Sequence, residues 1–279
     1  MYNNEIPKTK QLKEFQWPNG SRCAVALTWH VDAESGIIAD NPENMKHLAA
    51  VSEARSAITI GVPNVLEELD KQDLKATFFV PGAVADWYPE TVKSIHFAGH
   101  EIGHHGYMHE NVLKISEEEE EKILIKGMKS IENITGEKTK GWAAPFWGVK
   151  TSTPALLKKH GFLYDNSLMQ DYRPYRLETV HGDLMEIPIS LIGDDSQQFL
   201  FFPVFGSVMN TAQHAYETWT EEFDGIREMQ GLFTLIQHPN VTGRPGKIQM
   251  LRKLIAHMKQ YDDVWFATGK EIAEYCMKF

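Results

Sequence analysis

The stretch Gly99-His-Glu-Ile-Gly-His-His-Gly-Tyr-Met-His-Glu110 contains four histidines, two glutamates and three glycines in twelve positions. His105 and His109 are four residues apart, so on a helical turn both imidazoles would lie on one face and share a cation. His100 and His104 repeat this spacing, and spacing alone does not choose between the two pairs. Four histidines so close together favour a metal site over a surface loop or isolated core histidines. The two glutamates are available to orient the imidazoles, and a third ligand must come from elsewhere.

A short apolar run, Cys23-Ala-Val-Ala-Leu-Thr-Trp29, has the length of a buried strand and ends abruptly in His30-Val-Asp32-Ala-Glu34. Polar, metal-competent side chains at the carboxyl end of a buried strand are typical of an α/β-barrel active site. His30, Asp32 and Glu34 alternate, so they would point to one face if the strand continues through them. The alternative is a solvated turn that follows the strand.

Strand and helix patterns alternate along the chain, as expected for a single parallel α/β domain. Further strands are predicted at 74–80, 140–147, 162–167, 184–192, 198–204, 232–237 and 264–267, with helices at 62–70, 88–97, 116–134, 153–160, 212–229, 247–260 and 269–277. Polar residues recur at successive strand ends, which favours a barrel over an open sheet. We interpret residues 1–20 as an irregular arm before a domain of residues 21–279, and residues 36–60 as a long irregular loop. No glycine-rich phosphate loop follows any strand, which disfavours a nucleotide-binding fold.

The composition is that of a soluble globular protein, with 42% hydrophobic and 24% charged residues in a chain of 279. A net charge of −10 argues against phosphate-binding surfaces, and therefore against nucleic acid or a membrane as partner. Two cysteines, Cys23 and Cys276, are too few for a disulfide framework. The N-terminus lacks the apolar core of a secretory signal, and no apolar run approaches membrane-spanning length. We therefore expect a cytoplasmic protein.

The strand-end residues suggest a catalytic metal site. One carboxylate with two histidines is a typical catalytic set, because it leaves coordination positions open for water and substrate. Asp32 is the natural carboxylate, and a histidine pair from the 99–110 stretch would supply the imidazoles. His238 follows the strand predicted at 232–237 and is placed to act as a general acid on a leaving group.

These motifs together resemble the polysaccharide deacetylase (NodB-homology) superfamily, from about Ala24 to Ile272. The matching segments, in the family's order, are Leu27-Thr-Trp-His-Val-Asp-Ala-Glu34, Gly99-His-Glu-Ile-Gly-His-His-Gly-Tyr-Met-His109, Trp142-Ala-Ala-Pro-Phe-Trp147, Tyr164-Asp-Asn-Ser167 and Leu235-Ile-Gln-His-Pro239. The resemblance implies a distorted (β/α) barrel that hydrolyses carbon–nitrogen bonds other than peptide bonds. It also implies a divalent metal, usually zinc, on Asp32, His105 and His109, which selects this histidine pair.

Two positions depart from the family's pattern. His30 stands where the resemblance implies the catalytic-base aspartate, and Ala143 stands where it implies an arginine that orients the base. A histidine can still take a proton from water because its ordinary pKa is near neutrality, or it can become a fourth ligand. Both departures make ordinary sugar N-deacetylation less favoured than the family name suggests.

Finer details resemble a subgroup of intracellular members that includes peptidoglycan-deacetylase-like proteins, allantoinases and cyclic imide hydrolases, which are commonly homo-oligomers. These details are the Val-Asp-Ala-Glu-Ser-Gly start, the Leu-Met after Asn-Ser, and Gly243-Arg-Pro-Gly246. The resemblance to this subgroup implies a small-molecule substrate with an amide or ring carbon–nitrogen bond.

We therefore predict a metal-dependent hydrolase of small amides or cyclic imides, forming a homo-oligomer. His30 or Glu34 would act as base and His238 as acid, and Asp165 would orient His238 or its neighbours by analogy. Substrate contacts are predicted from Trp29, Pro145, Phe146 and Trp147. The alternatives are an N-deacetylase of acetamido sugars, such as peptidoglycan or chitooligosaccharides, and a catalytically inactive binding protein.

Overall fold

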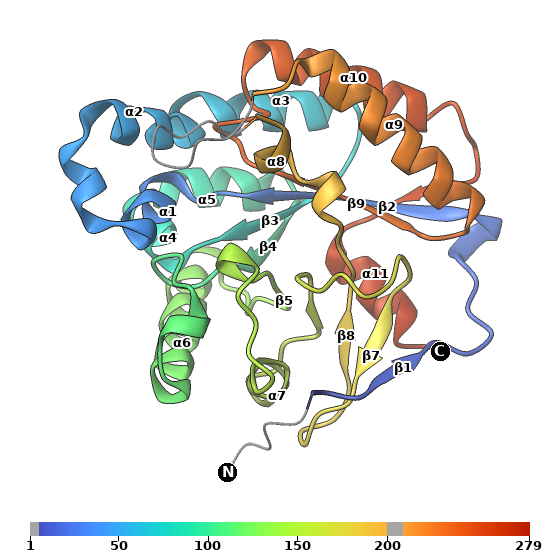
Figure 1. Ribbon diagram of the computed structural model, residues 1–279, viewed down its shortest axis with the longest axis horizontal. Coiled ribbons are helices and arrows are strands. Elements are labelled where there is room, and N and C mark those ends of the chain that lie inside the picture. The colour runs from blue at the N-terminus through green and yellow to red at the C-terminus, as the bar shows by residue number, and fades with distance from the viewer. Residues whose placement is uncertain (1–5, 200–208) are drawn as a thin grey trace.

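The computed structural model describes residues 6–199 and 209–279 and shows an α/β domain with helices around a curved sheet (Figure 1). The strands are β1 (Thr9–Gln11), β2 (Cys23–His30), β3 (Thr77–Val80), β4 (Glu101–His104), β5 (Gly141–Trp142), β6 (Tyr164–Asp165), β7 (Tyr175–Leu177), β8 (Leu184–Glu186), β9 (Leu232–Gln237) and β10 (Val264–Phe266). The helices are α1 (Ala33–Asp40), α2 (Leu48–Ser56), α3 (Val62–Lys71), α4 (Gly82–Trp87), α5 (Pro89–Phe97), α6 (Glu117–Thr135), α7 (Thr153–Lys159), α8 (Asp195–Phe199), α9 (Ala212–Glu228), α10 (Pro245–Met258) and α11 (Gly269–Cys276).

The sheet has the strand order β1-β7-β8-β6-β5-β4-β3-β2-β10, and β9 also pairs with β2. The pairings between β8 and β10 along this order are parallel, as is that of β9 with β2, whereas β7 and β1 extend the edge in antiparallel fashion. A parallel bridge between Asp194 and Ile236 joins the chain after β8 to β9, so the sheet returns towards β2. This is the distorted (β/α) barrel that the sequence predicted, in a single domain.

Strand β2 pairs with β3, β9 and β10, and all eight of its residues are buried. The odd-numbered side chains, Cys23, Val25, Leu27 and Trp29, belong to the core beneath the outer helices. Ala24 and Ala26 lie in a second cluster inside the barrel together with Phe79. Because side chains alternate along a strand, His30 continues the inner row and Trp29 the outer row. The last residue of β2 is therefore directed into the barrel.

The segment 36–60, predicted to be an irregular loop, is largely helical. It contains the end of α1, the 3₁₀ helix Pro42–Lys46, α2 and most of the π-helix Ala57–Gly61. Ile37, Val51 and Ala54 form a small apolar cluster where α1 meets α2. Helices in proteins are stabilised mainly by such packing between elements. The polar composition of residues 36–60 therefore did not indicate that the segment is helical.

Two other segments differ from their predictions. Residues 198 and 199 lie in helix α8 instead of a strand, and residues 200–204 of that prediction lie outside the described residues. A short apolar run does not distinguish strand from helix. The arm predicted to be irregular contains β1, which pairs with β7, and its Trp17 is buried with Nε1 donating to the Gln230 carbonyl at 3.1 Å. The arm therefore contributes to the sheet and the core, and the boundary at residue 20 stays a prediction.

The sequence composition also led to predictions about the two cysteines and about the location of the protein. Cys23 and Cys276 are both buried and free, and burial raises the pKa of each thiol to about 12, so neither is reactive. No helix in residues 6–199 or 209–279 combines the length and apolar character that crossing a membrane requires. The cytoplasmic location stays a prediction.

Candidate metal centre

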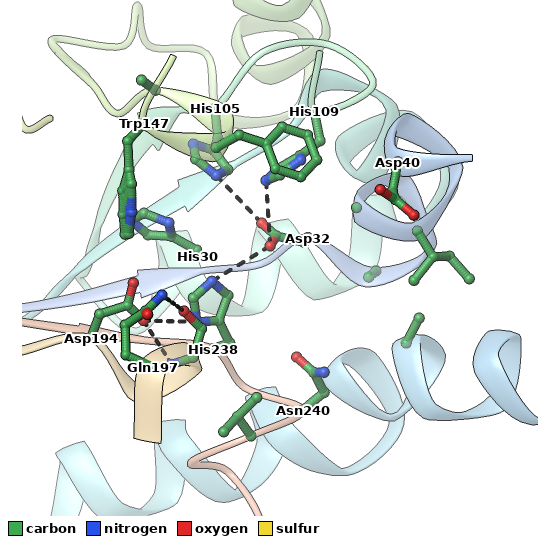
Figure 2. A pocket seen from close by; sticks show the side chains of 18 of the residues that line it. His30, Asp32, Asp40, His105, His109, Trp147, Asp194, Gln197, His238 and Asn240 are labelled. Carbon is green, nitrogen blue, oxygen red and sulfur yellow. Dashed lines mark hydrogen bonds and ion pairs between the residues drawn. The ribbon is translucent and has the colours of Figure 1, made fainter. Parts of the chain in front are cut away.

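Three side chains with metal-ligating atoms meet at the carboxyl ends of β2 and β4 (Figure 2). β2 ends at His30, and Asp32 immediately precedes helix α1. β4 ends at His104, so His105 and His109 lie in the loop directly after it. Asp32 Oδ1 is 3.5 Å from His105 Nε2, and Asp32 Oδ2 is 3.5 Å from His109 Nε2. The structure therefore brings together the three predicted ligands.

The loop that carries His109 is not the helical turn on which the spacing argument relied. Residues 105–111 form no helix, and His109 has a left-handed φ of 60°. Glu110 holds this loop, because its carboxylate accepts the backbone N–H groups of Tyr107 at 2.9 Å and Met108 at 2.8 Å. Glu110 thus orders the loop without touching the imidazoles.

The donor atoms fit a divalent cation. His105 Nδ1 lies 2.7 Å from the Ala143 carbonyl oxygen, which can only accept, so Nδ1 carries the proton and the Nε2 lone pair faces Asp32. His105 Nε2 and Asp32 Oδ1 are both buried without a hydrogen-bond partner among the described residues. Burial, above all, lowers the pKa of His105 and of His109 to about 3, so both rings are neutral at physiological pH. Buried lone pairs that face one another in this way favour a cation between them.

His238 faces the same group from the other side, directly after β9 (Figure 2). Its Nε2 lies 3.6 Å from Asp32 Oδ2, and its Nδ1 donates to Asp195 Oδ1 at 2.7 Å. The backbone N–H of His238 donates to the second Asp195 oxygen at 2.9 Å. Burial alone lowers the pKa of His238, but the charge of Asp195, with those of Asp32 and Asp194, outweighs burial and raises it to about 10. His238 is therefore protonated, as a general acid must be.

Asp165, predicted to orient His238, does not do so. On β6, Tyr164 packs inside the barrel, so the next residue faces away from the interior. Asp165 pairs in register with Glu186 of β8 and does not line the cavity. Asp195 holds His238 instead.

Sequence reasoning missed Asp195 because it does not end a predicted strand; it is the first residue of α8. The available signal was the adjacent pair Asp194-Asp195, just after the strand predicted at 184–192. Asp194 lines the cavity, and burial raises its pKa to about 6.

Glu34, predicted as an alternative base, is buried away from the cavity. Helix α1 begins at Ala33, so the strand alternation that would have aligned Glu34 with Asp32 is lost. One Glu34 oxygen accepts hydrogen bonds from Arg55 Nε at 2.7 Å and Tyr88 Oη at 2.6 Å. Glu34 therefore anchors α2 and α5 to α1 and takes no direct part in the site.

Two of the four predicted substrate contacts are wrong. Trp29 faces the outer helices and stacks on Phe78, because odd-numbered residues of β2 point outward. Pro145 is buried behind the cavity wall and does not line the cavity. Phe146 and Trp147 do line it, and the Phe146 ring packs 4.5 Å from that of His109, measured between centroids.

The cavity has a volume of about 330 Å³ and includes all three ligands, His30 and His238. The His30 ring centroid is 4.4 Å from that of His105 and 5.3 Å from that of His238. His30 Nε2 is buried without a partner among the described residues. Burial, and then the neighbouring histidines, lower the pKa of His30 well below its usual value, so the ring is neutral. His30 therefore presents a neutral ring with an unpaired nitrogen inside the cavity.

Comparisons with known proteins identify the family of this chain. The sequence profile of the family described as polysaccharide deacetylase matches residues 57–164. A peptidoglycan deacetylase of Helicobacter pylori is 32% identical over an alignment that covers 91% of this chain and 96% of that protein. The chain belongs to the polysaccharide deacetylase family. The superfamily predicted from the motifs is therefore confirmed.

Solved structures support the same assignment. A crystal structure from Mycobacterium smegmatis, described as a polysaccharide deacetylase, matches with 38% identity and a TM-score of 0.92, covering 100% of this chain and 96% of that one. A crystal structure of an allantoinase matches with a TM-score of 0.82 over 93% of this chain and 91% of that one. Its identity of 21% shows a shared fold. The two structures therefore agree with the barrel fold of this chain.

Proposed function

We propose that this deacetylase-family chain is a metal-dependent amide hydrolase that removes acetyl groups from acetamido sugars, such as peptidoglycan or chitooligosaccharide fragments. The observation that carries the proposal is the position of Asp32, His105 and His109 opposite a protonated His238 across one cavity. The reaction needs a polarised carbonyl, a water nucleophile and an acid for the departing nitrogen. The peptidoglycan deacetylase relative supports the sugar substrate, because its similarity spans almost the whole chain.

The ligand set would hold a divalent metal, which we propose to be zinc, and the metal when bound would activate a water and polarise the amide carbonyl. His238 would donate its Nε2 proton to the departing nitrogen, while Asp195 holds the ring and its charged state. His30, neutral and with an unpaired Nε2, is the candidate acceptor for the proton that the water loses. Phe146 and Trp147 would limit access of bulk water to these groups.

Small amides and cyclic imides or ureides form the second candidate substrate class. A cavity of about 330 Å³ is at the small end of the range for ligand sites, and His30 and Ala143 depart from the pattern of the sugar deacetylases. A catalytically inactive binding protein is the third possibility, motivated by the same two departures. Homo-oligomer formation stays a prediction.

The decisive experiment is mass spectrometry of zinc-loaded protein incubated separately with N-acetylglucosamine oligomers, succinimide, hydantoin and allantoin. We expect loss of acetyl groups from the oligomers. Gain of one water by a ring compound, with no change in the sugars, would overturn the sugar proposal in favour of the second candidate. His105→Ala protein is the control, since any activity that it retains does not come from this metal centre.

A further inference from the structure

One face of helix α1 forms a wall of the cavity. Asp32, Ala33, Gly36, Ile37 and Asp40 all line the cavity. Positions spaced by four along a helix lie on one face, and eight residues advance about 12 Å along its axis. Asp40 is the last residue of α1, so it lies at the end of this wall away from the metal ligand Asp32. In Figure 2, Asp40 is on the side of Asp32 opposite to Trp147.

The part of the cavity away from the metal ligands offers no positive charge. Its polar lining includes Asp40, Asn44 and Asn240. Among the described residues that line the cavity there is no lysine or arginine, and the sequences 1–5 and 200–208 contain neither.

The arginines on nearby elements are already paired. Arg55 of α2 contacts Glu34, and Arg244 donates to Glu53 Oε2 at 2.5 Å. Neither arginine lines the cavity. A carboxylate on a substrate would therefore meet Asp40 without a balancing cation, whereas an ammonium or hydroxyl group would find acceptors.

We propose that Asp40 determines substrate charge: the site favours amides that carry a cationic or hydrogen-bond-donating group at the Asp40 end of the cavity, and disfavours those with a carboxylate there. This inference rests on the proposed function for the position of the reacting amide. For an acetamido sugar bound with its amide at the metal ligands, a neighbouring ring would occupy that end of the cavity. A neighbouring ring that carries a free amine would bind better than an acetylated one, so partly deacetylated oligosaccharides would be preferred substrates.

The test uses three disaccharides that share one acetamido ring and carry an amine, an acetamide or a carboxylate on the second ring. Zinc-loaded protein is titrated by calorimetry, which gives Kd where no acetate is released and KM where it is. We expect the amine compound to bind most tightly and the carboxylate compound most weakly, with a span of roughly tenfold. Asp40→Asn should remove most of this span, and Asp40→Lys should reverse the order.

Glu43→Gln is the matched control, because Glu43 is an exposed carboxylate three residues further along that pairs with Lys46 and does not line the cavity. It changes the net charge as Asp40→Asn does, and it should leave the order of affinities for the three disaccharides unchanged. Equal affinities for the three compounds, no binding of any, or an order that survives Asp40→Asn would overturn the inference. The expected order without acetate release from any compound would support the inference on Asp40 and refute the proposed deacetylation.

Discussion

Two histidine pairs with the same spacing have different roles in this protein. His105 and His109 direct ring nitrogens at Asp32. His104 uses both of its nitrogens on the backbone: Nε2 donates to the Leu124 carbonyl at 3.1 Å, and Nδ1 accepts the N–H of Gly106 at 3.2 Å. His100 Nδ1 likewise accepts the N–H of Ala76 at 3.2 Å.

The difference shows that a ligand requires a free lone pair that faces a cavity. Burial lowers the pKa of His104 and His100 to about 4, as it lowers those of the ligand pair, so charge state does not separate the pairs. The two pairs differ in the groups that surround each imidazole ring. His104 lies against helix α6, whereas His105 has the cavity in front of it.

The largest effect is expected from His105→Ala. Removing one of three ligands should abolish stoichiometric metal binding, and turnover should fall on the order of 10³-fold because metal catalysis supplies several kcal/mol. Metal content by plasma mass spectrometry and kcat from acetate release measure the two effects.

The matched variant His104→Ala should keep its metal. It leaves the Leu124 carbonyl and the Gly106 N–H without their partner, at a cost of about 1–3 kcal/mol for each buried group. Its free energy of unfolding should therefore fall while metal content stays near one per chain. Equal metal loss in the two variants would contradict the distinction between the pairs.

Asp195→Asn should have the next largest effect. The amide no longer stabilises the charged ring of His238, so the acid contribution to catalysis, about 10²- to 10⁴-fold, is largely lost. KM and metal content should change little, since Asp195 belongs with Asp194 and His238 to a group separate from that of Asp32, His105 and His109. Steady-state kinetics on sugar oligomers measure whether kcat falls while KM stays the same. Loss of metal would show instead that Asp195 supports the ligand set.

Glu110→Gln tests the loop that presents His109. A glutamine can accept only one of the two backbone N–H groups that Glu110 now accepts, so the loop loses part of its order. Metal affinity should fall about tenfold, the lower end for partners that support metal ligands. Competition with a fluorescent chelator measures the affinity, and an unchanged value would show that the loop holds its shape without this carboxylate.

The smallest effect on activity is expected from Asp165→Asn, which tests whether buried polar atoms outside the cavity matter for the metal. Burial, above all, raises the pKa of Asp165 to about 6, and burial with the charge of Asp165 raises that of Glu186 well above its usual value. The folded state therefore binds protons more strongly than the unfolded chain between about pH 4 and 6. Stability contributed by these groups is present at low pH and is lost as pH rises through this window.

In Asp165→Asn the free energy of unfolding should decrease less as pH rises than in the unmutated protein. The reason is that the raised pKa of Asp165 is removed, and each pKa unit is worth about 1.4 kcal/mol. Urea unfolding at several pH values between 4 and 7 measures the difference, and metal content should not change. A variant with the original pH dependence would show that the pair is not a source of it.

The barrel and the carboxylate ligand were predictable because their signals are local, whereas the choice of His105 and His109 over the second pair came from the family resemblance. The apolar runs that form β2 and β9 are confined to a few residues, and the motif around His105 and His109 is contiguous. Asp32 follows β2 directly, so its position at the strand end required only the strand prediction. The helices α1 and α2 escaped prediction, because their stability comes from packing between them and not from a strong apolar pattern.

Only the tertiary structure decided which neighbours of the ligands take part. Glu34 and Trp29 lie within five residues of Asp32, yet the start of α1 and the outward row of β2 remove them from the site. Asp195 lies far from His238 in sequence and contacts it only because α8 packs beside the end of β9. The sequence by itself determined the long buried strands β2 and β9 and the metal-ligating motif, since these depend on neighbouring residues. The direction in which each side chain faces depends on where strands end and which elements meet, and those are properties of the folded chain.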